Sequence, residues 1–166
     1  SAAFDMVPWK FEEYERFEDD SVFDDAVKRG SYILAYSKTV IKKVCDKAVK
    51  RKHNDMDVLV VNSSHWMSEI GAKLAPDCDF AMIWYYDHDK RNYNCSLRAF
   101  HDAVDVSEIA KQFGGGGHKK AAGFKLPFES HPDKIFDTSD ETSQKDLQEA
   151  KEAIKDLAEK VESNSL

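Results

Sequence analysis

The sequence has few cysteines, and their positions do not suggest a cross-linked or zinc-bound fold. Three occur among 166 residues, Cys45, Cys78 and Cys95, far apart and without a CxxC spacing. An odd number of widely spaced cysteines argues against a disulfide framework and against a zinc site. We therefore expect reduced thiols and a domain that is stabilised by its hydrophobic core.

Long apolar runs are also lacking. No stretch of about 18 apolar residues is present that could span a bilayer. The first residues do not show the basic, apolar and small-residue succession of a signal peptide. We expect a cytoplasmic protein without a membrane partner. Because the chain opens on Ser1 rather than methionine, we also expect part of the function to lie upstream.

Basic residues are fewer than acidic ones in the chain as a whole, 24 against 31. The net charge is −7 and the pI about 5.4, which disfavours a protein that coats long nucleic acids by charge alone. Basic residues nevertheless cluster in 38–53 and beside a glycine run at 114–117, whereas 12–25 and 137–162 are mostly acidic. A polyanionic ligand would therefore have to meet a local basic patch.

Hydrophobic periodicity predicts an α/β fold: a small mixed β-sheet flanked by helices, with a long N-terminal helix and a C-terminal helical extension. We predict helices over 8–18, 22–52, 66–74, 105–113 and 142–162, and strands over 56–62, 80–86, 93–98 and 121–126.

The same pattern suggests four regions along the chain. We predict a helical lead-in over 1–21, a globular domain over 22–126, a linker over 127–140 that carries two prolines, and an amphipathic helix over 141–166. The last helix could dock on the long N-terminal helix or pair with another chain, which would make a homodimer.

Four consecutive glycines, Gly114, Gly115, Gly116 and Gly117, stand between a predicted helix and a predicted strand, and His118 and Lys119 follow them. Glycine loses more backbone entropy on folding than other residues, so such a run needs a compensating use. A loop without side chains can direct backbone N–H groups at a phosphate, and His118 and Lys119 can complete an anion site. The alternative is a flexible turn with an ordinary surface histidine.

Three motifs extend this glycine run into a longer pattern. They are Ser96-Leu97-Arg98, Asp105-Val106-Ser107-Glu108-Ile109-Ala110, and the glycine run with His118-Lys119-Lys120-Ala121-Ala122-Gly123-Phe124. In order and spacing they closely resemble the signature of the DHH-associated domain, subfamily one. This is the C-terminal domain of many DHH-superfamily phosphoesterases, such as RecJ-type exonucleases and oligoribonucleases. A weaker resemblance covers residues 27–126.

The resemblance implies the substrate-binding portion of a manganese-dependent phosphodiesterase. By the same resemblance, Arg98, Ser96, the four glycines, His118 and Lys119 would bind the phosphates of a short oligonucleotide, nucleotide or dinucleotide. A separate N-terminal DHH domain would bind manganese and cleave. In this chain Asp87-His88-Asp89 is a predicted hairpin tip without supporting carboxylates, so we assign neither catalytic residues nor metal ligands here.

Two other classes of function remain open from the sequence. The chain could be a stand-alone RNA-binding module whose flanking helices bind a protein. It could also be an assembly scaffold in which the glycine run is only a turn. Aspartate-rich motifs preceding Ser1 would favour the phosphoesterase, and failure to bind any phosphate ligand would favour the scaffold.

Overall fold

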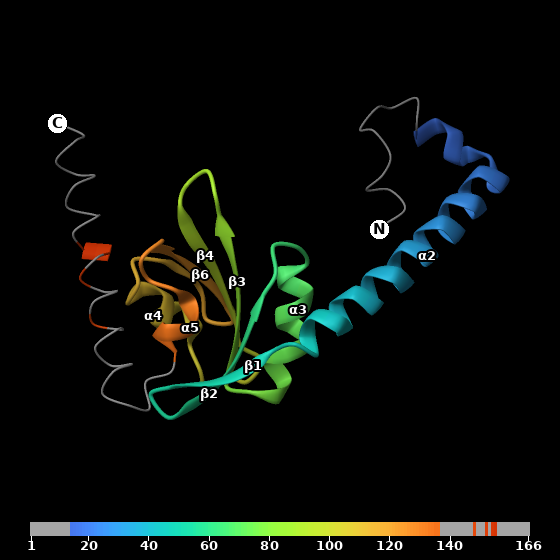
Figure 1. The fold of residues 1–166 in the computed structure, drawn as a ribbon. Coiled ribbons are helices and arrows are strands. Elements are labelled where there is room, and N and C mark those ends of the chain that lie inside the picture. The colour runs from blue at the N-terminus through green and yellow to red at the C-terminus, as the bar shows by residue number, and fades with distance from the viewer. Residues whose placement is uncertain (1–13, 137–147, 149–151, 153, 156–166) are drawn as a thin grey trace. The chain divides into compact units, whose positions relative to one another are not determined.

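The computed structural model describes residues 14–136, 148, 152, 154 and 155 (Figure 1). The chain divides into two compact units, Ser1–Lys43 and Val44–Leu166. In the part of the chain that the structure describes, no helix is long and apolar enough to cross a membrane. The cysteines Cys45, Cys78 and Cys95 are free thiols, and burial raises the pKa of each of them.

The first unit contains most of the long helix α2, Asp20–Cys45, preceded by the short 3₁₀ helix η2, Arg16–Glu18. Most of the helix predicted over 8–18 lies outside the described residues. The residues of α2 that recur at helical spacing are unevenly buried: Gly30 and Ile41 are buried, while Phe23, Val27 and Leu34 are exposed.

The predicted end of this helix at residue 52 is wrong. The helix ends at Cys45, and Val49–His53 form strand β1, which pairs with the next strand in an antiparallel hairpin. Asn54 and Asp55 make the turn with φ values of 47° and 68°, a left-handed conformation typical of two-residue hairpins. His53 is fully buried against Phe80 and Phe136, with ring centroids 6.2 and 5.1 Å away. Lys50 and Lys52 therefore lie on a strand.

The second unit is built on a six-stranded sheet with the order β1-β2-β3-β4-β6-β5 (Figure 1). The remaining strands are β2 (Met56–Asn62), β3 (Phe80–Asp87), β4 (Asn92–Arg98), β5 (Gly116–His118) and β6 (Ala121–Pro127). β2 and β3 run parallel, and all other neighbours are antiparallel, so the sheet is mixed. The predicted α/β class with a small mixed sheet is confirmed.

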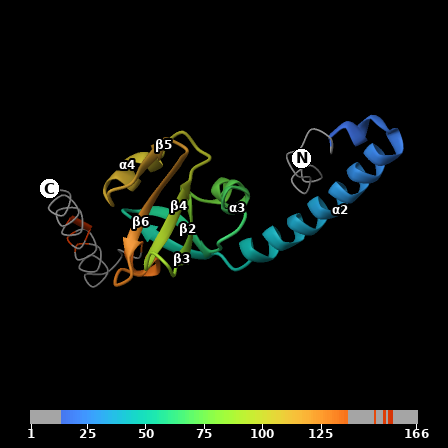
Figure 2. The ribbon, with the colours of Figure 1, turned by 90° about the horizontal axis from the view of Figure 1, so that it is seen from above.

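Helices pack on opposite faces of this sheet (Figures 1 and 2). On one face, α4 (Val106–Lys111) and α5 (Pro132–Ile135) pack on alternate strand residues such as Phe80, Met82 and Leu97, forming the main core. On the other face lies α3 (Met67–Leu74), followed by the 3₁₀ helix η3 (Ala75–Asp77). Because α3 has eight residues, it covers only part of its face, which we call the open face.

Part of the segment predicted as a linker, 127–140, belongs to the core. Pro132–Ile135 form α5, and the adjoining Ile135 and Phe136 are 1% and 0% exposed within the main hydrophobic cluster. The C-terminal helix predicted over 142–162 lies largely outside the described residues. Of its described positions, Ile154 is partly buried and packs against the cluster.

These contacts predict where the chain can be shortened. A chain ending at Phe136 should keep a cooperative unfolding transition, because it retains Ile135 and Phe136. A chain ending at Ser130 should lose it, since deleting a large buried side chain costs about 2–5 kcal/mol. Urea unfolding followed by circular dichroism would compare the two, and equal stability would contradict the assignment of 135–136 to the core.

Candidate functional site

Strand β4 places a row of polar side chains on the open face. Along this strand Tyr93, Cys95 and Leu97 are buried in the core, while the alternate residues are only half-buried. Those alternate residues are Asn92, Asn94, Ser96 and Arg98. Successive strand residues point to opposite faces, so these four side chains share the open face with α3.

Arg98 is held in place by three hydrogen bonds. Its Nη1 donates to Ser96 Oγ and to the Leu97 carbonyl oxygen, each at 2.8 Å, and its Nη2 donates to Ser68 Oγ at 3.1 Å. All three acceptors are neutral, and the structure shows no carboxylate paired with Arg98 among the residues it describes. The guanidinium is therefore fixed in position while its charge stays available to an anion.

Gly71 of α3 makes room for the stem of Arg98. A Cβ atom at Gly71 would lie 2.5 Å from Arg98 Cγ and 3.0 Å from Ile83 Cδ1. Such distances are too short for a side chain at residue 71, so α3 can approach the sheet closely only with glycine there. Ser68, one turn earlier on the helix, consequently comes within hydrogen-bonding distance of Arg98.

The strand register places His118 on the same face as Arg98. Ala121 of β6 lies opposite Arg98 on one side and opposite His118 on the other. Directly opposed residues of antiparallel strands point to the same face, and two strand spacings separate the outer residues by about 10 Å. The small Ala121 side chain lies between the two basic groups, so an anion can approach both of them.

Helix α4 leads into the glycine run. Its N-cap residue, Asp105, accepts a hydrogen bond from the Ser107 N–H at 2.9 Å, and Glu108 pairs with Lys111 at 2.6 Å. At the other end Gly114 adopts a φ of 69°, and the Gly115 N–H donates to the Ala110 carbonyl oxygen at 2.9 Å. The glycine run therefore ends the helix, as the sequence predicts.

The fold explains two of the next three glycines. A Cβ at Gly115 would lie 2.2 Å from the Gly123 carbonyl oxygen, and Gly117 has a φ of 144° and would meet the Ala121 oxygen at 2.6 Å. Gly116 differs, because a Cβ there would meet no atom within 4 Å and its φ lies outside the positive range. Nothing in the described fold requires glycine at residue 116. The second half of the run is also not a loop, since Gly116–His118 form β5.

Of the two lysines after His118, Lys120 is paired with an acidic group. Lys120 Nζ lies 2.8 Å from Asp102 Oδ1 and donates to the Phe100 carbonyl oxygen at 3.0 Å, and this contact lowers the pKa of Asp102. Lys119 is exposed. The hydrogen bond from the Ser107 side chain is the main cause that lowers the pKa of Asp105, and the charge of Lys119 adds a smaller effect there and at Asp102. These carboxylates partly offset the charge of Lys119, whereas no carboxylate is paired with Arg98 or His118 among the described residues.

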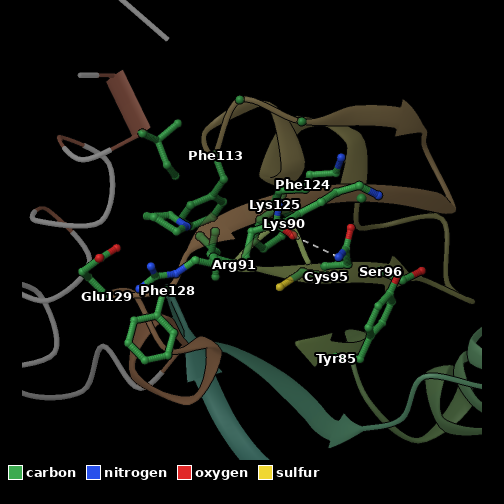
Figure 3. Close-up of a pocket in the computed structure, with 18 of the residues that line it drawn as sticks. Tyr85, Lys90, Arg91, Cys95, Ser96, Phe113, Phe124, Lys125, Phe128 and Glu129 are labelled. Carbon is green, nitrogen blue, oxygen red and sulfur yellow. Dashed lines mark hydrogen bonds between the residues drawn. The ribbon is translucent and has the colours of Figure 1, made fainter. Parts of the chain in front are cut away.

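Arg98, Ala121 and His118 lie side by side across three strands, and we call them the Arg98–His118 row. An open pocket of about 1240 Å³ lies farther along the same strands (Figure 3). Three of the eight predicted residues line it, namely Ser96, Gly114 and Gly115, while Arg98, His118, Gly116, Gly117 and Lys119 do not. Ser96 links the two places, because it lines the pocket and accepts a hydrogen bond from Arg98.

The pocket is more basic than the chain as a whole. Among the described residues, its lining includes the cations Lys90, Arg91 and Lys125 and one carboxylate, that of Glu129. The backbone N–H of Lys90 bonds Asp87 at 3.1 Å and its ammonium lies 3.3 Å from the same carboxylate, which lowers the pKa of Asp87. The side chains of Arg91 and Lys125 have no hydrogen-bond or ion-pair partner among the described residues. The described lining thus carries more positive than negative side chains although the chain has a net charge of −7.

The sequence did not indicate five further residues that lie on this surface: Ser68, Gly71, Tyr85, Asn94 and Lys125. A usable signal existed for Asn94, because polar and apolar residues alternate throughout 92–98. No local pattern marks Ser68 or Gly71, since their relation to Arg98 depends on how α3 crosses the sheet.

The structure offers no site for manganese in the region it describes. No group of three or more His, Cys, Asp and Glu side chains is close enough there to hold a metal ion. Asp87 and His88 lie at the hairpin between β3 and β4, where Asp87 is paired with Lys90 and the His88 ring packs on Tyr86. These residues do not form a ligand set for a divalent cation.

Comparison with known protein families shows that residues 30–162, most of the chain, match the family described as "DHHA1 domain". An uncharacterized protein, R106 of Acanthamoeba polyphaga mimivirus, is 35% identical over 137 residues. That match covers 74% of this chain and 32% of the viral protein. The oligoribonuclease NrnB of Bacillus subtilis is 39% identical over 70 residues, covering 40% of this chain and 16% of NrnB. The chain therefore spans a third or less of these relatives.

A solved structure shares the fold. The pGpG-specific phosphodiesterase PggH from Vibrio cholerae aligns with a TM-score of 0.50 at 16% identity, covering 63% of this chain and 38% of PggH.

The glycine geometry predicts contrasting effects of two substitutions. Gly115→Ala should destabilise the fold, because its Cβ would overlap the Gly123 carbonyl oxygen and Phe124. Gly116→Ala should leave the free energy of unfolding within about 0.5 kcal/mol, as expected for a substitution that meets no other atom. Urea titrations of both variants would measure this, and equal destabilisation would show that residue 116 is packed.

Proposed function

This chain belongs to the DHHA1 domain family, and on that basis we propose that it binds the phosphate end of a short oligonucleotide or dinucleotide at the Arg98–His118 row. In this proposal it is the substrate-binding portion of a DHH-superfamily phosphoesterase. The names of two relatives, an oligoribonuclease and a pGpG-specific phosphodiesterase, support this class of ligand.

The main support for the proposal is that a side chain at residue 116 would contact no other atom of the described fold. Gly115 and Gly117 are accounted for by their contacts with β6, whereas Gly116 meets nothing within 4 Å. Gly116 lies in the strand that ends with His118, two strand positions from it on the open face. A glycine that the fold does not require, next to two basic groups without carboxylate partners, is explained by a ligand that approaches the backbone closely.

Arg98 and His118 supply complementary contacts to such a phosphate. The Arg98 guanidinium is a planar donor whose position Ser96 and Ser68 already fix, so binding a phosphate requires little further ordering. The His118 imidazole is exposed and has no polar partner among the described residues. An anion between them would receive donors from two strands, with the glycine backbone beneath it.

Cleavage in this proposal belongs to a companion domain outside the chain. Manganese bound there would activate a water molecule and neutralise the scissile phosphate. The residues described here do not fit that cation, so their part is to bind and orient the ligand. The expected partners are accordingly a short nucleic acid and the DHH domain.

Alanine substitutions test the phosphate site. Arg98→Ala and His118→Ala should each weaken the binding of adenosine 5′-monophosphate roughly tenfold, because each removes a charge-assisted hydrogen bond contributing about 1.5–3 kcal/mol. Lys50→Ala is the matched control, since Lys50 is an exposed cation on β1 at the far edge of the sheet. Calorimetric titration at fixed salt would compare them. Equal affinities of the Arg98→Ala, His118→Ala and Lys50→Ala variants would show that the phosphate binds elsewhere.

The absence of a fitting metal site within the described residues leads to a second prediction. The purified chain should not hydrolyse short oligoribonucleotides in the presence of manganese. Product release would be followed by chromatography of a labelled dinucleotide. Turnover that follows this chain through successive purification steps would overturn the assignment of cleavage to a companion domain.

A further inference from the structure

We propose that the pocket beside the Arg98–His118 row is a subsite for a second nucleotide, in which Tyr85 stacks on the base and Lys125 binds the adjoining phosphate. This inference rests on the proposed phosphate site and specifies its ligand. The preferred ligand is a dinucleotide or longer oligonucleotide, and a mononucleotide occupies only half of the surface.

The sheet register places the two subsites in line along β4. Arg98 lies in the row that contains Ala121 and His118, and Asn94 lies in a second row between Tyr85 and Lys125. Four residues of a strand separate these rows by about 13 Å. A single phosphate cannot contact both rows, so a ligand that does must continue into a second nucleotide.

Among the described residues, the row between the two subsites has small residues at its accessible positions, and its large residue, Ile83, is buried. The intermediate row pairs Ser96 with Gly123, and Gly123 in turn lies opposite Gly116. A Cβ at Gly123 would lie 2.9 Å from the Cys95 carbonyl oxygen, so close strand packing explains why this residue is glycine. The result is a shallow passage over backbone, through which a sugar–phosphate chain can pass from Arg98 toward Lys125.

Tyr85 is the aromatic residue of the pocket that is positioned to receive a base. Its neighbours Trp84 and Tyr86 project to the other face, where their rings contact Tyr93 with centroids 5.6 and 5.2 Å away. Tyr85 is half-buried and lines the pocket (Figure 3), and its side chain makes no ring contact or hydrogen bond among the described residues. An aromatic face that lacks a partner beside cations is the usual platform for a stacked base.

Lys125 and Arg91 supply charge at this end of the pocket. Lys125 is exposed on the open face in the same row as Tyr85, and Arg91 lies in the hairpin that follows β3. Glu129 is the carboxylate that opposes them in the pocket lining, whereas Lys90 is already paired with Asp87. Asn94 lies between Tyr85 and Lys125, and its amide donates to Asn92 Oδ1 at 3.1 Å, which orients it.

Titration of the whole chain with ligands of increasing length tests the proposal. The probes are adenosine 5′-monophosphate, the dinucleotide pApA, and pApA whose second residue lacks its base. We expect pApA to bind at least tenfold more tightly than the mononucleotide, and the abasic ligand to lose most of that gain. Equal affinities for the mononucleotide and pApA would overturn the second subsite.

Variants separate this proposal from the phosphate site on which it rests. Tyr85→Leu and Lys125→Gln should each reduce the affinity for pApA about tenfold and leave mononucleotide binding unchanged. Tyr85→Leu should add little to the loss caused by the abasic ligand, because both remove the same contact. Lys50→Gln is the control for a lost surface cation.

The pattern of failure identifies which proposal is wrong. Unchanged pApA affinity in Tyr85→Leu and Lys125→Gln, with mononucleotide binding still dependent on Arg98, rejects the second subsite alone. If Arg98→Ala leaves the mononucleotide affinity unchanged, the phosphate site itself is wrong. Circular dichroism of each variant confirms that a change in affinity does not arise from unfolding.

Discussion

The antiparallel pairing of β4 with β6 is the constraint on which the rest of the surface depends. It sets Arg98 opposite Ala121 and Ser96 opposite Gly123, and β5 extends the same rows to His118 and Gly116. A shift of one residue would turn Arg98 and Ser96 into the core and expose Leu97 and Cys95. Burial of these apolar side chains therefore fixes the register, and the register brings the basic residues together.

Much of this arrangement could be predicted from the sequence. The strand boundaries at 56–62 agree with the structure, and those of β3, β4 and β6 are close to it, because each segment is apolar or alternating and is bounded by polar turns. The N-cap at Asp105 and the helix stop at the glycine run follow from local backbone chemistry alone. The signature motifs likewise pointed to the family that the comparison shows.

The errors arose where distant contacts outweigh local pattern. Residues 46–52 continue the helical rhythm of α2, but the Asn54–Asp55 turn and the burial of His53 between aromatic rings favour a strand. Ile135 and Phe136 follow prolines and polar residues, and only tertiary packing shows that they close the core. The contacts of Ser68 and Gly71 with Arg98 depend on how a helix crosses the sheet, which spacing along the chain does not reveal.

The three hydrogen bonds to Arg98 also affect the thermodynamics of recognition. A surface arginine usually samples many rotamers, and ordering it on binding opposes association by about 0.5–1.5 kcal/mol. Here Ser96, Ser68 and the Leu97 carbonyl oxygen restrict the guanidinium before a ligand arrives, and the adjoining glycines have no side chains to order. If the proposed phosphate site is correct, a rigid surface of this kind would discriminate by fit: a ligand whose phosphate is displaced would gain little, because the protein side cannot adjust to it.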